Sequence, residues 1–452
     1  MLAGMNRFLK YGLLAFAGLA VLLPIFFALV AATLDPNDFK PQFAALVEAK
    51  SHRTLTVPGN IKLAFFPRFA MDIGRATLSE YGSPAEFASI EGARLDLAWL
   101  PLLRGELSAG KIRVDGLRVR LVRRRDGSTN FDDLLRPGQT RFEIAGLRAT
   151  GAAVFSDEAA GRQLAVTDLK LETGPLGGGR AGDASAHFNL RSDEPALDIR
   201  IDANGRLALD NRAGRLTWQG LTMTARGEAG GLSGLVLTAT GNIESERRAK
   251  HWLLQDIGIT VAGRRGDAAF GADLHIPQLA DRGDALHADV LAAGLEWRQG
   301  KSVFRAKLDG RLDLDLEKGR IVLPQLAASM NFRPSGSRSG GSAQLSGTAL
   351  LDLGDKSAHL DMAGRLDGGR IKIGLAASGA GMPRYAFDMD AERLDLDRYL
   401  PLAPSAAARH QADFSWLKRF DVWGRLHVGE LKMTGAISRN VTFEIAPLAS
   451  GK

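Results

Sequence analysis

The stretch LDGRLDLDLE, residues 308–317, has a charged residue at every odd position and leucine or glycine at every even position. Successive side chains of a β-strand point to opposite faces, so this alternation predicts a strand with one wet face and one apolar face. A helix would spread the same charges around its whole circumference. We therefore expect Leu312, Leu314 and Leu316 to lie together on the apolar face of a sheet.

The same alternation recurs along most of the chain after residue 55. Strands with one wet face are typical of antiparallel sheets, and glycine-containing turn signals separate many of them. Typical strand lengths predict roughly two dozen strands, with little helix after residue 50 except one or two turns near 130–136 and 397–418. The turn signals are Asp126-Gly127, Gly177-Gly178-Gly179, Asn204-Gly205, Gly230-Gly231, Gly319 and Gly368-Gly369.

The apolar face of such a sheet has to be covered, and two arrangements can do this. A second sheet would give a sandwich, whereas a sheet that curls would line a groove able to hold an apolar ligand. Composition as a whole slightly favours the sandwich, but aromatic residues are only 7% of the chain, which favours a smooth trough. The segment PSGSRSGGS, residues 334–342, predicts a flexible loop or a break in the sheet.

An uncharged apolar span, Tyr11 to Leu34, precedes the β region. A helix of this length crosses a hydrocarbon core of ~30 Å, so the span predicts one transmembrane helix. Arg7 and Lys10 precede it and Asp35 follows it, which places the N-terminus in the cytoplasm. A cleaved signal peptide is the alternative, although the apolar core of a signal peptide usually runs only ~7–15 residues.

Helix-capping residues follow the span at once, in DPND at 35–38. Phe39, Phe43, Leu46 and Val47 then recur at helical spacing and mark one apolar face of a short amphipathic helix that ends near Lys50. We expect this face to pack against the start of the sheet, with the bilayer surface as the alternative.

Composition and motifs argue against catalysis. The chain has no cysteine, which excludes disulfides, thiolate nucleophiles and cysteine zinc sites. It contains no phosphate-binding loop, no nucleophile elbow and no zinc-protease motif, and none of its eight histidines lies two to four residues from another. Asp132-Asp133 and the pair Asp313 and Asp315 have a glycosidase alternative, but alternation with leucine marks the second pair as surface residues. We expect no enzyme, cofactor or metal site.

The net charge of +7 suggests an anionic partner. Outside the cytoplasm this means lipid headgroups and not nucleic acid, although a merely solvated surface explains the charge equally well. Arg123, Arg124 and Arg125 end a predicted strand and are candidate headgroup contacts, although protection of a strand edge is the favoured interpretation. Lys418-Arg419, between Trp416 and Trp423, forms a second candidate patch.

Several N-terminal segments stand out: DPNDFKP at 35–41, NIKLAFFPRF at 60–69, PLLRGEL at 101–107, KIRVDGLRVRL at 111–121 and DGSTNFDDLL at 126–135. In this order they resemble the N-terminal region of the AsmA family of bacterial envelope proteins. Two further segments, 393–401 and 424–431, resemble the stretch that leads into the family's C-terminal module, whereas residues 140–385 match in pattern only. Ser51-His52-Arg53 departs from the family's Thr-Gly-Arg, and the chain stops where family members continue, so we expect a short or truncated member.

The resemblance implies a single-pass protein of the bacterial inner membrane, with most of its chain in the periplasm. Its mainly β fold would be an elongated, curved, largely antiparallel sheet that forms an apolar-lined groove. The expected parts are a cytoplasmic tip and span at 1–34, an N-terminal domain at 35–139, a groove at 140–400 and the start of a C-terminal module at 401–452. The implied function is to handle or transfer phospholipid or another acyl lipid and to support outer-membrane assembly.

Two other functions remain open from the sequence. One is a membrane-tethered sandwich that binds an envelope protein through an exposed strand edge, and the other is a tethered hydrolase, disfavoured by the missing nucleophile motifs. Bound phospholipid would favour the lipid function over the scaffold. Lipid identity, the direction of transfer and the oligomeric state are not encoded in any motif.

Overall fold

The computed structural model describes residues 35–64, 70–97, 109–135, 143–211, 213–246, 251–282, 285–337, 339–379, 384–399 and 421–445. The predicted membrane span Tyr11–Leu34 lies outside these residues, as do the predicted domain boundaries at 139/140 and 400/401. Within the described ranges no helix has both the length and the apolar character needed to cross a membrane.

The chain divides into two compact units, and the division falls within strand β11, Leu197–Asp210. Unit 1 comprises Met1–Glu194 and Ala208–Arg212, and unit 2 comprises Pro195–Leu207 and Ala213–Lys452.

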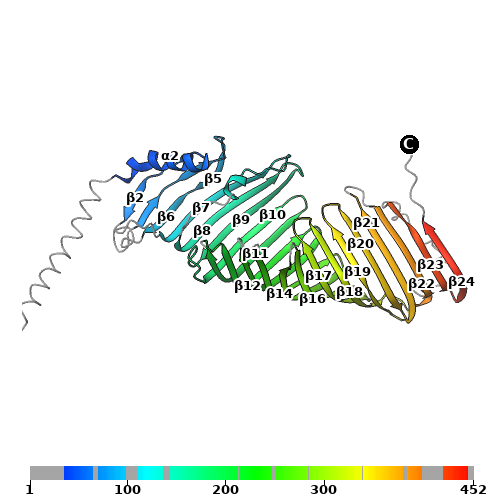
Figure 1. The fold of residues 1–452 in the computed structure, drawn as a ribbon. Helices are drawn as coiled ribbons and strands as arrows, with labels where there is room; N and C mark the ends of the chain where they lie inside the picture. The colour runs from blue at the N-terminus through cyan, green and yellow to red at the C-terminus, as the bar shows by residue number, and fades with distance from the viewer. Residues whose placement is uncertain are drawn as a thin grey trace, which may run out of the picture. The chain divides into compact units, whose positions relative to one another are not determined.

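Unit 1 begins with a 3-10 turn, η1, and helix α2, which lies beside the first short strands (Figure 1). Asp35 caps η1 by accepting a hydrogen bond from the Asn37 amide, as its sequence predicts. The strands pair in antiparallel fashion apart from β7 and β8, which are parallel. The elements are η1 Pro36–Phe39, α2 Lys40–Ser51, β1 Leu55–Thr56, β2 Ile61–Ala64, β3 Ala70–Ile73, β4 Ala76–Ser79, β5 Glu86–Ile90, β6 Gly92–Leu97, β7 Ala109–Arg123, α4 Asp132–Leu135, β8 Ile144–Asp157, β9 Arg162–Thr173 and β10 Gly182–Ser192.

Unit 2 is a meander in which, from β12 onward, each strand pairs with the next along the chain (Figure 1). All of these pairs are antiparallel except β22 with β23. The elements are β12 Arg215–Ala229, β13 Leu232–Glu246, β14 His251–Arg265, β15 Ala268–Arg282, β16 Ala285–Gln299, β17 Ser302–Asp315, β18 Arg320–Arg333, β19 Gly341–Asp352, β20 Ser357–Leu366, β21 Gly369–Ser378, β22 Arg384–Asp395, η2 Leu396–Arg398, β23 Asp421–Met433 and β24 Ala436–Ile445.

These elements confirm the prediction of a mainly β, largely antiparallel protein, with 24 strands in the described residues. The short helical segments α4 and η2 lie where turns of helix are predicted. The turn predicted at Asn204-Gly205 is wrong, because both residues lie inside β11. Glycine is needed there for another reason: a Cβ at Gly205 would lie 2.3 Å from Nε1 of Trp218.

The apolar face of unit 2 is not the interior of a sandwich. Its strands belong to one sheet and pair with their neighbours in sequence, and within the described ranges no second sheet covers that face. Large apolar side chains consequently stay open to solvent, among them Leu351 and Leu375, which are 40% and 41% exposed.

A series of β-bulges crosses the middle of the strands of unit 2. Because a bulge bends its strand and increases the local twist, bulges at a similar level in successive strands curve the sheet at that level. The register shifts fall between Trp218 and Leu221, Thr240 and Asn242, Ala288 and Leu291, Gly310 and Asp313, and Leu323 and Leu326.

A buried arginine holds the segment DGSTNFDDLL to the start of the β region in unit 1. The Arg53 guanidinium is fully buried; its Nε and one terminal nitrogen donate to the two carboxylate oxygens of Asp133 at 2.8 and 2.6 Å. It also donates to the carbonyls of Ser79 and Asn130 and lies 4.2 Å above the centre of the Phe87 ring. Asp133 therefore has a structural role in unit 1.

His52, next to Arg53, has a backbone conformation that favours glycine. His52 has φ of 53°, in the left-handed region that glycine adopts without steric cost. Histidine is one of the residues that tolerate this region, and its ring packs edge-on against Tyr81 with centroids 5.5 Å apart.

The apolar face predicted on α2 is not buried against the sheet. Phe43 is 46% and Leu46 is 53% exposed, whereas Val47 is half-buried. The favoured prediction, a helix that packs this face on the sheet, is therefore wrong for Phe43 and Leu46.

Candidate functional site

Two rows of cross-strand neighbours form an apolar surface on unit 2 that is open over β18–β22. Residues directly opposite each other on paired strands share a face of the sheet. The first row runs from β16 to β23 through Leu286, Leu314, Ile321, Leu351, Ala358, Ala377, Tyr385 and Val422. The second runs from β18 to β22 through Leu323, Ala349, Leu360, Leu375 and Phe387.

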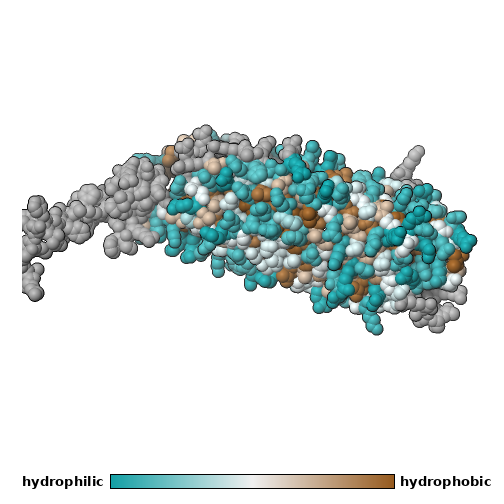
Figure 2. All heavy atoms as spheres, turned by 60° about the horizontal axis from the view of Figure 1, so that its bottom comes forward, coloured by the Kyte–Doolittle hydropathy of each residue, from teal (hydrophilic) through white to brown (hydrophobic). Residues whose placement is uncertain are grey.

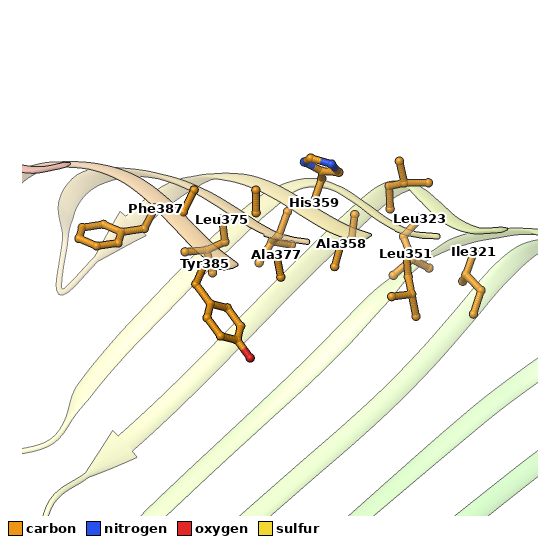
Figure 3. A pocket seen from close by; sticks show the side chains of 14 residues that line it. Ile321, Leu323, Leu351, Ala358, His359, Leu375, Ala377, Tyr385 and Phe387 are labelled. Carbon is orange, nitrogen blue, oxygen red and sulfur yellow. The ribbon is translucent and has the colours of Figure 1, made fainter. Parts of the chain in front are cut away.

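These rows are hollowed into a pocket of about 560 Å³ across β18–β22. Ala358 on β20 and Ala377 on β21 form its floor, with Ile321 and Leu323 on one side and Tyr385 and Phe387 on the other (Figure 3). Ala349 on β19 also lines the pocket. The small floor residues leave room that larger side chains would fill. We call these two rows and the pocket between them the apolar groove.

The opposite face of the same strands is polar. His359 points away from Tyr385, on the other side of the sheet (Figure 3). Further along this face Arg425 pairs with Asp388 at 3.2 Å, and His427 with Asp390 at 3.1 Å. The strands therefore separate an apolar surface from a charged one. Figure 2 shows one face of the molecule, on which brown hydrophobic patches lie among hydrophilic residues.

On either side of the pocket, the apolar side chains of the sheet are buried against one another. One cluster, which includes Met362, Ile371 and Val428, is between 0% and 7% exposed. A second cluster around Leu286 and Leu312 lies on the other side and contacts Ile321 and Leu323. Access to the apolar face between β18 and β22 is therefore concentrated at the pocket.

The three leucines predicted to line a groove occupy different places. Leu314 lies in the first row, next to Ile321 of the pocket, and Leu312 is buried at 9% exposure in the cluster beside it. Leu316 lies in the turn after β17 and is 62% exposed. Contact of these leucines with a ligand stays a prediction.

The three arginines predicted to meet headgroups are exposed at the end of β7 and in the turn that follows. Arg123 lies 3.7 Å from Asp157, and Arg124 lies 3.5 Å from Glu80. These distances fit protection of the strand end, and a headgroup role stays a prediction for Arg123, Arg124 and Arg125. Residues 416–419 of the second basic patch lie outside the described residues.

His287 has acidic neighbours on the polar side of the groove strands. Its Nδ1 contacts Asp313, and its Nε2 lies 3.0 Å from Asp289, which also lies 3.7 Å from Arg282. The hydrogen bond to Asp313, followed by that to Asp289, raises the pKa of His287 above its ordinary value of 6.5. Within the described ranges, His, Cys, Asp and Glu residues form no group of three or more suited to a metal ion.

We expect this network to stabilise unit 2 in acid more than in base. A raised histidine pKa contributes stability that is fully present below about pH 6.5 and is lost as the pH rises through the folded-state pKa. His287→Gln should therefore lower the melting temperature most below pH 6.5, and the difference from wild type should shrink at higher pH. A difference that grows with pH would contradict this assignment, and His359→Gln is the control on the same face.

Sequence patterning missed the pocket residues on β20–β22. The signal was present in residues 384–390, where Tyr385, Phe387 and Met389 alternate with smaller or charged residues. What the sequence could not show is which of several alternating strands remain uncovered, because that depends on the pairing register and the bulges.

Comparisons with known proteins identify relatives of the chain. A sequence model of the AsmA family matches residues 5–243. Protein AsmA of Escherichia coli (strain K12) is 23% identical over 185 residues, which is 38% of this chain and 29% of that protein. The match thus covers less than a third of the relative's length, and no solved structure matches significantly.

Proposed function

The chain belongs to the AsmA family, and from this premise we propose that it is a bacterial envelope protein whose apolar groove binds the acyl chains of phospholipid. It would be held in the inner membrane by Tyr11–Leu34 and extend into the periplasm. The observation that carries the proposal is the open pocket of about 560 Å³ between two apolar rows on a sheet whose other face is charged.

The physical argument rests on the cost of exposed hydrocarbon. Each methylene moved from water to an apolar surface contributes ~0.8 kcal/mol, so covering part of an acyl chain removes much of the barrier to crossing an aqueous gap. Leu351 and Leu375 are 40% and 41% exposed in the pocket and would themselves be covered by the ligand. Binding would therefore remove both the acyl chain and the pocket leucines from contact with water.

Transfer follows from the continuity of the first row. Beyond the pocket this row continues to the half-buried side chains of Leu314 on β17 and Val422 on β23. A lipid could move along this row without leaving apolar contact. Support of outer-membrane assembly is the proposed consequence of such transfer, and catalysis forms no part of the proposal.

A photo-crosslinking amino acid at Leu351 or Leu375 tests the ligand directly. We expect the full chain, irradiated in bacterial membranes, to yield phospholipid adducts at both positions, because both side chains line the pocket. Leu353 is the matched control, since it is 58% exposed but lies in the turn after β19. Equal phospholipid labelling at Leu353 and Leu351, or none at either pocket position, would refute the proposal.

A scaffold that binds another envelope protein is the second candidate, and strand β24 favours it. This strand pairs only with β23 among the described strands, and its Ile437, Phe443 and Ile445 are between 42% and 58% exposed. An unprotected edge of this kind can accept a strand from another chain. Crosslinking of one defined protein at Phe443, without lipid at Leu351, would support the scaffold instead.

A further inference from the structure

Three arginines stand side by side on the polar face of unit 1. Arg94 on β6 is paired in register with Arg113 on β7, which is paired in register with Arg148 on β8. Figure 1 shows these three strands as neighbours. Like charges directly opposite each other on a sheet repel, so this row, which we call the arginine ladder, destabilises the sheet unless something compensates it.

The two outer arginines are compensated by carboxylates. Arg94 lies 3.1 Å from Asp72 and 3.5 Å from Asp96, and Arg148 lies 2.9 Å from Glu172. The central residue differs, because no carboxylate in the described part of the chain lies within ion-pair distance of Arg113. The positive charge of the ladder is therefore concentrated at its middle.

A hollow lies over this uncompensated charge. A cavity of about 220 Å³ is lined by all three arginines and by Lys111, which precedes Arg113 by two residues and points to the same face. Lys111 likewise has no ion-pair partner in the described ranges. Four cationic side chains and two carboxylates, those of Asp96 and Glu172, thus line the same space, so positive charge is in excess there.

We propose that the arginine ladder binds a phosphate group, with Arg113 and Lys111 as the principal contacts. Guanidinium groups present paired N–H donors that match the oxygens of phosphate, and lysine adds a point charge. A doubly charged anion would relieve the repulsion between the arginines, whereas chloride offers no bidentate geometry. The phosphate can belong to a lipid headgroup or be free in solution, and this site does not depend on ligand binding in the apolar groove.

Substitution of Arg113 should weaken phosphate binding but, in the absence of phosphate, should stabilise strands β6–β8. Titration of the full chain in detergent with inorganic phosphate, followed by calorimetry at constant ionic strength, should give saturable binding. Arg113→Gln should weaken that binding at least tenfold and, without phosphate, should slow hydrogen exchange in β6–β8 because the repulsion is removed. Arg118→Gln is the matched control: Arg118 is also exposed on β7 but already pairs with Glu91 at 2.9 Å.

The measured affinities distinguish a lipid headgroup from free phosphate, and both from a surface that binds neither. Dihexanoyl phosphatidic acid that binds at least tenfold more tightly than inorganic phosphate, and competes with it, assigns the site to a lipid headgroup. Equal affinities assign it to free phosphate. Equal phosphate binding by wild type, Arg113→Gln and Arg118→Gln, or no saturable binding at all, would overturn the proposal and leave the ladder as a solvated surface.

Discussion

Replacement of Asp133 with alanine should open unit 1 locally and strongly. The substitution leaves the Arg53 guanidinium, whose side chain is 0% exposed, without its carboxylate partner. Breaking a buried ion pair by removal of one partner typically costs about 3–5 kcal/mol, because a buried charge remains uncompensated. We expect amide hydrogen-exchange protection in residues 53–64 and 120–135 to fall by about 150- to 5,000-fold.

The adjacent acid provides the control. Asp132 accepts hydrogen bonds from the amide and hydroxyl of Thr129 at 2.8 and 2.6 Å and is exposed, so Asp132→Ala should cost only about 1 kcal/mol. A double variant, Arg53→Met with Asp133→Leu, removes both charges and should recover much of the protection. Equal effects of the two single alanine variants would show that the buried pair does not hold this segment.

Low pH should weaken the ion pair between Arg53 and Asp133. The hydrogen bond from Arg53 holds the pKa of the Asp133 carboxyl below its ordinary value of 3.8. A lowered pKa contributes stability that is present above the unfolded value and is lost as the pH falls through the folded value. The ion pair between Arg53 and Asp133 therefore contributes its full stability at neutral pH and weakens only in strong acid.

The features of the fold that depend on local sequence patterns could be predicted from the sequence. Period-two alternation predicted the strands, the wet and apolar faces and the scarcity of helix, because these depend on local side-chain direction. Leu312 and Leu314 were placed on the apolar face for that reason. The segment DGSTNFDDLL was recognised as a family motif, but its role was not, since Arg53 and Asp133 are 80 residues apart.

Features that depend on register could not be predicted. Leu316 continues the alternation of 308–317, yet β17 ends at Asp315 and the leucine lies in a turn. The pocket exists because Ala349, Ala358 and Ala377 come into register between larger residues. The arginine ladder likewise joins residues from three strands, and no single segment contains its pattern.

Filling the pocket floor should abolish most lipid binding without unfolding the protein. Ala358 lies on the floor between Leu351 and Ala377, and a phenylalanine at this position would project into the open pocket of about 560 Å³. Because the pocket is open, the ring need not displace packed core atoms, so the melting temperature should stay close to that of wild type. If the ring displaces three or four methylenes of an acyl chain, the loss is about 2–3 kcal/mol, or about 30- to 150-fold in affinity.

The measurement is phospholipid retained by the purified chain and transferred between vesicles, for wild type, Ala358→Phe and Ala363→Phe. Ala363 lies on the same strand but is exposed on the polar face, opposite Ser346 and Lys372, so it controls for added hydrophobicity. A pocket of reduced length should also favour shorter acyl chains, because fewer methylenes then need to be covered. Wild-type retention and transfer by Ala358→Phe would mean that lipid does not occupy this pocket, whereas equal loss in both variants would point to a nonspecific effect of the added ring.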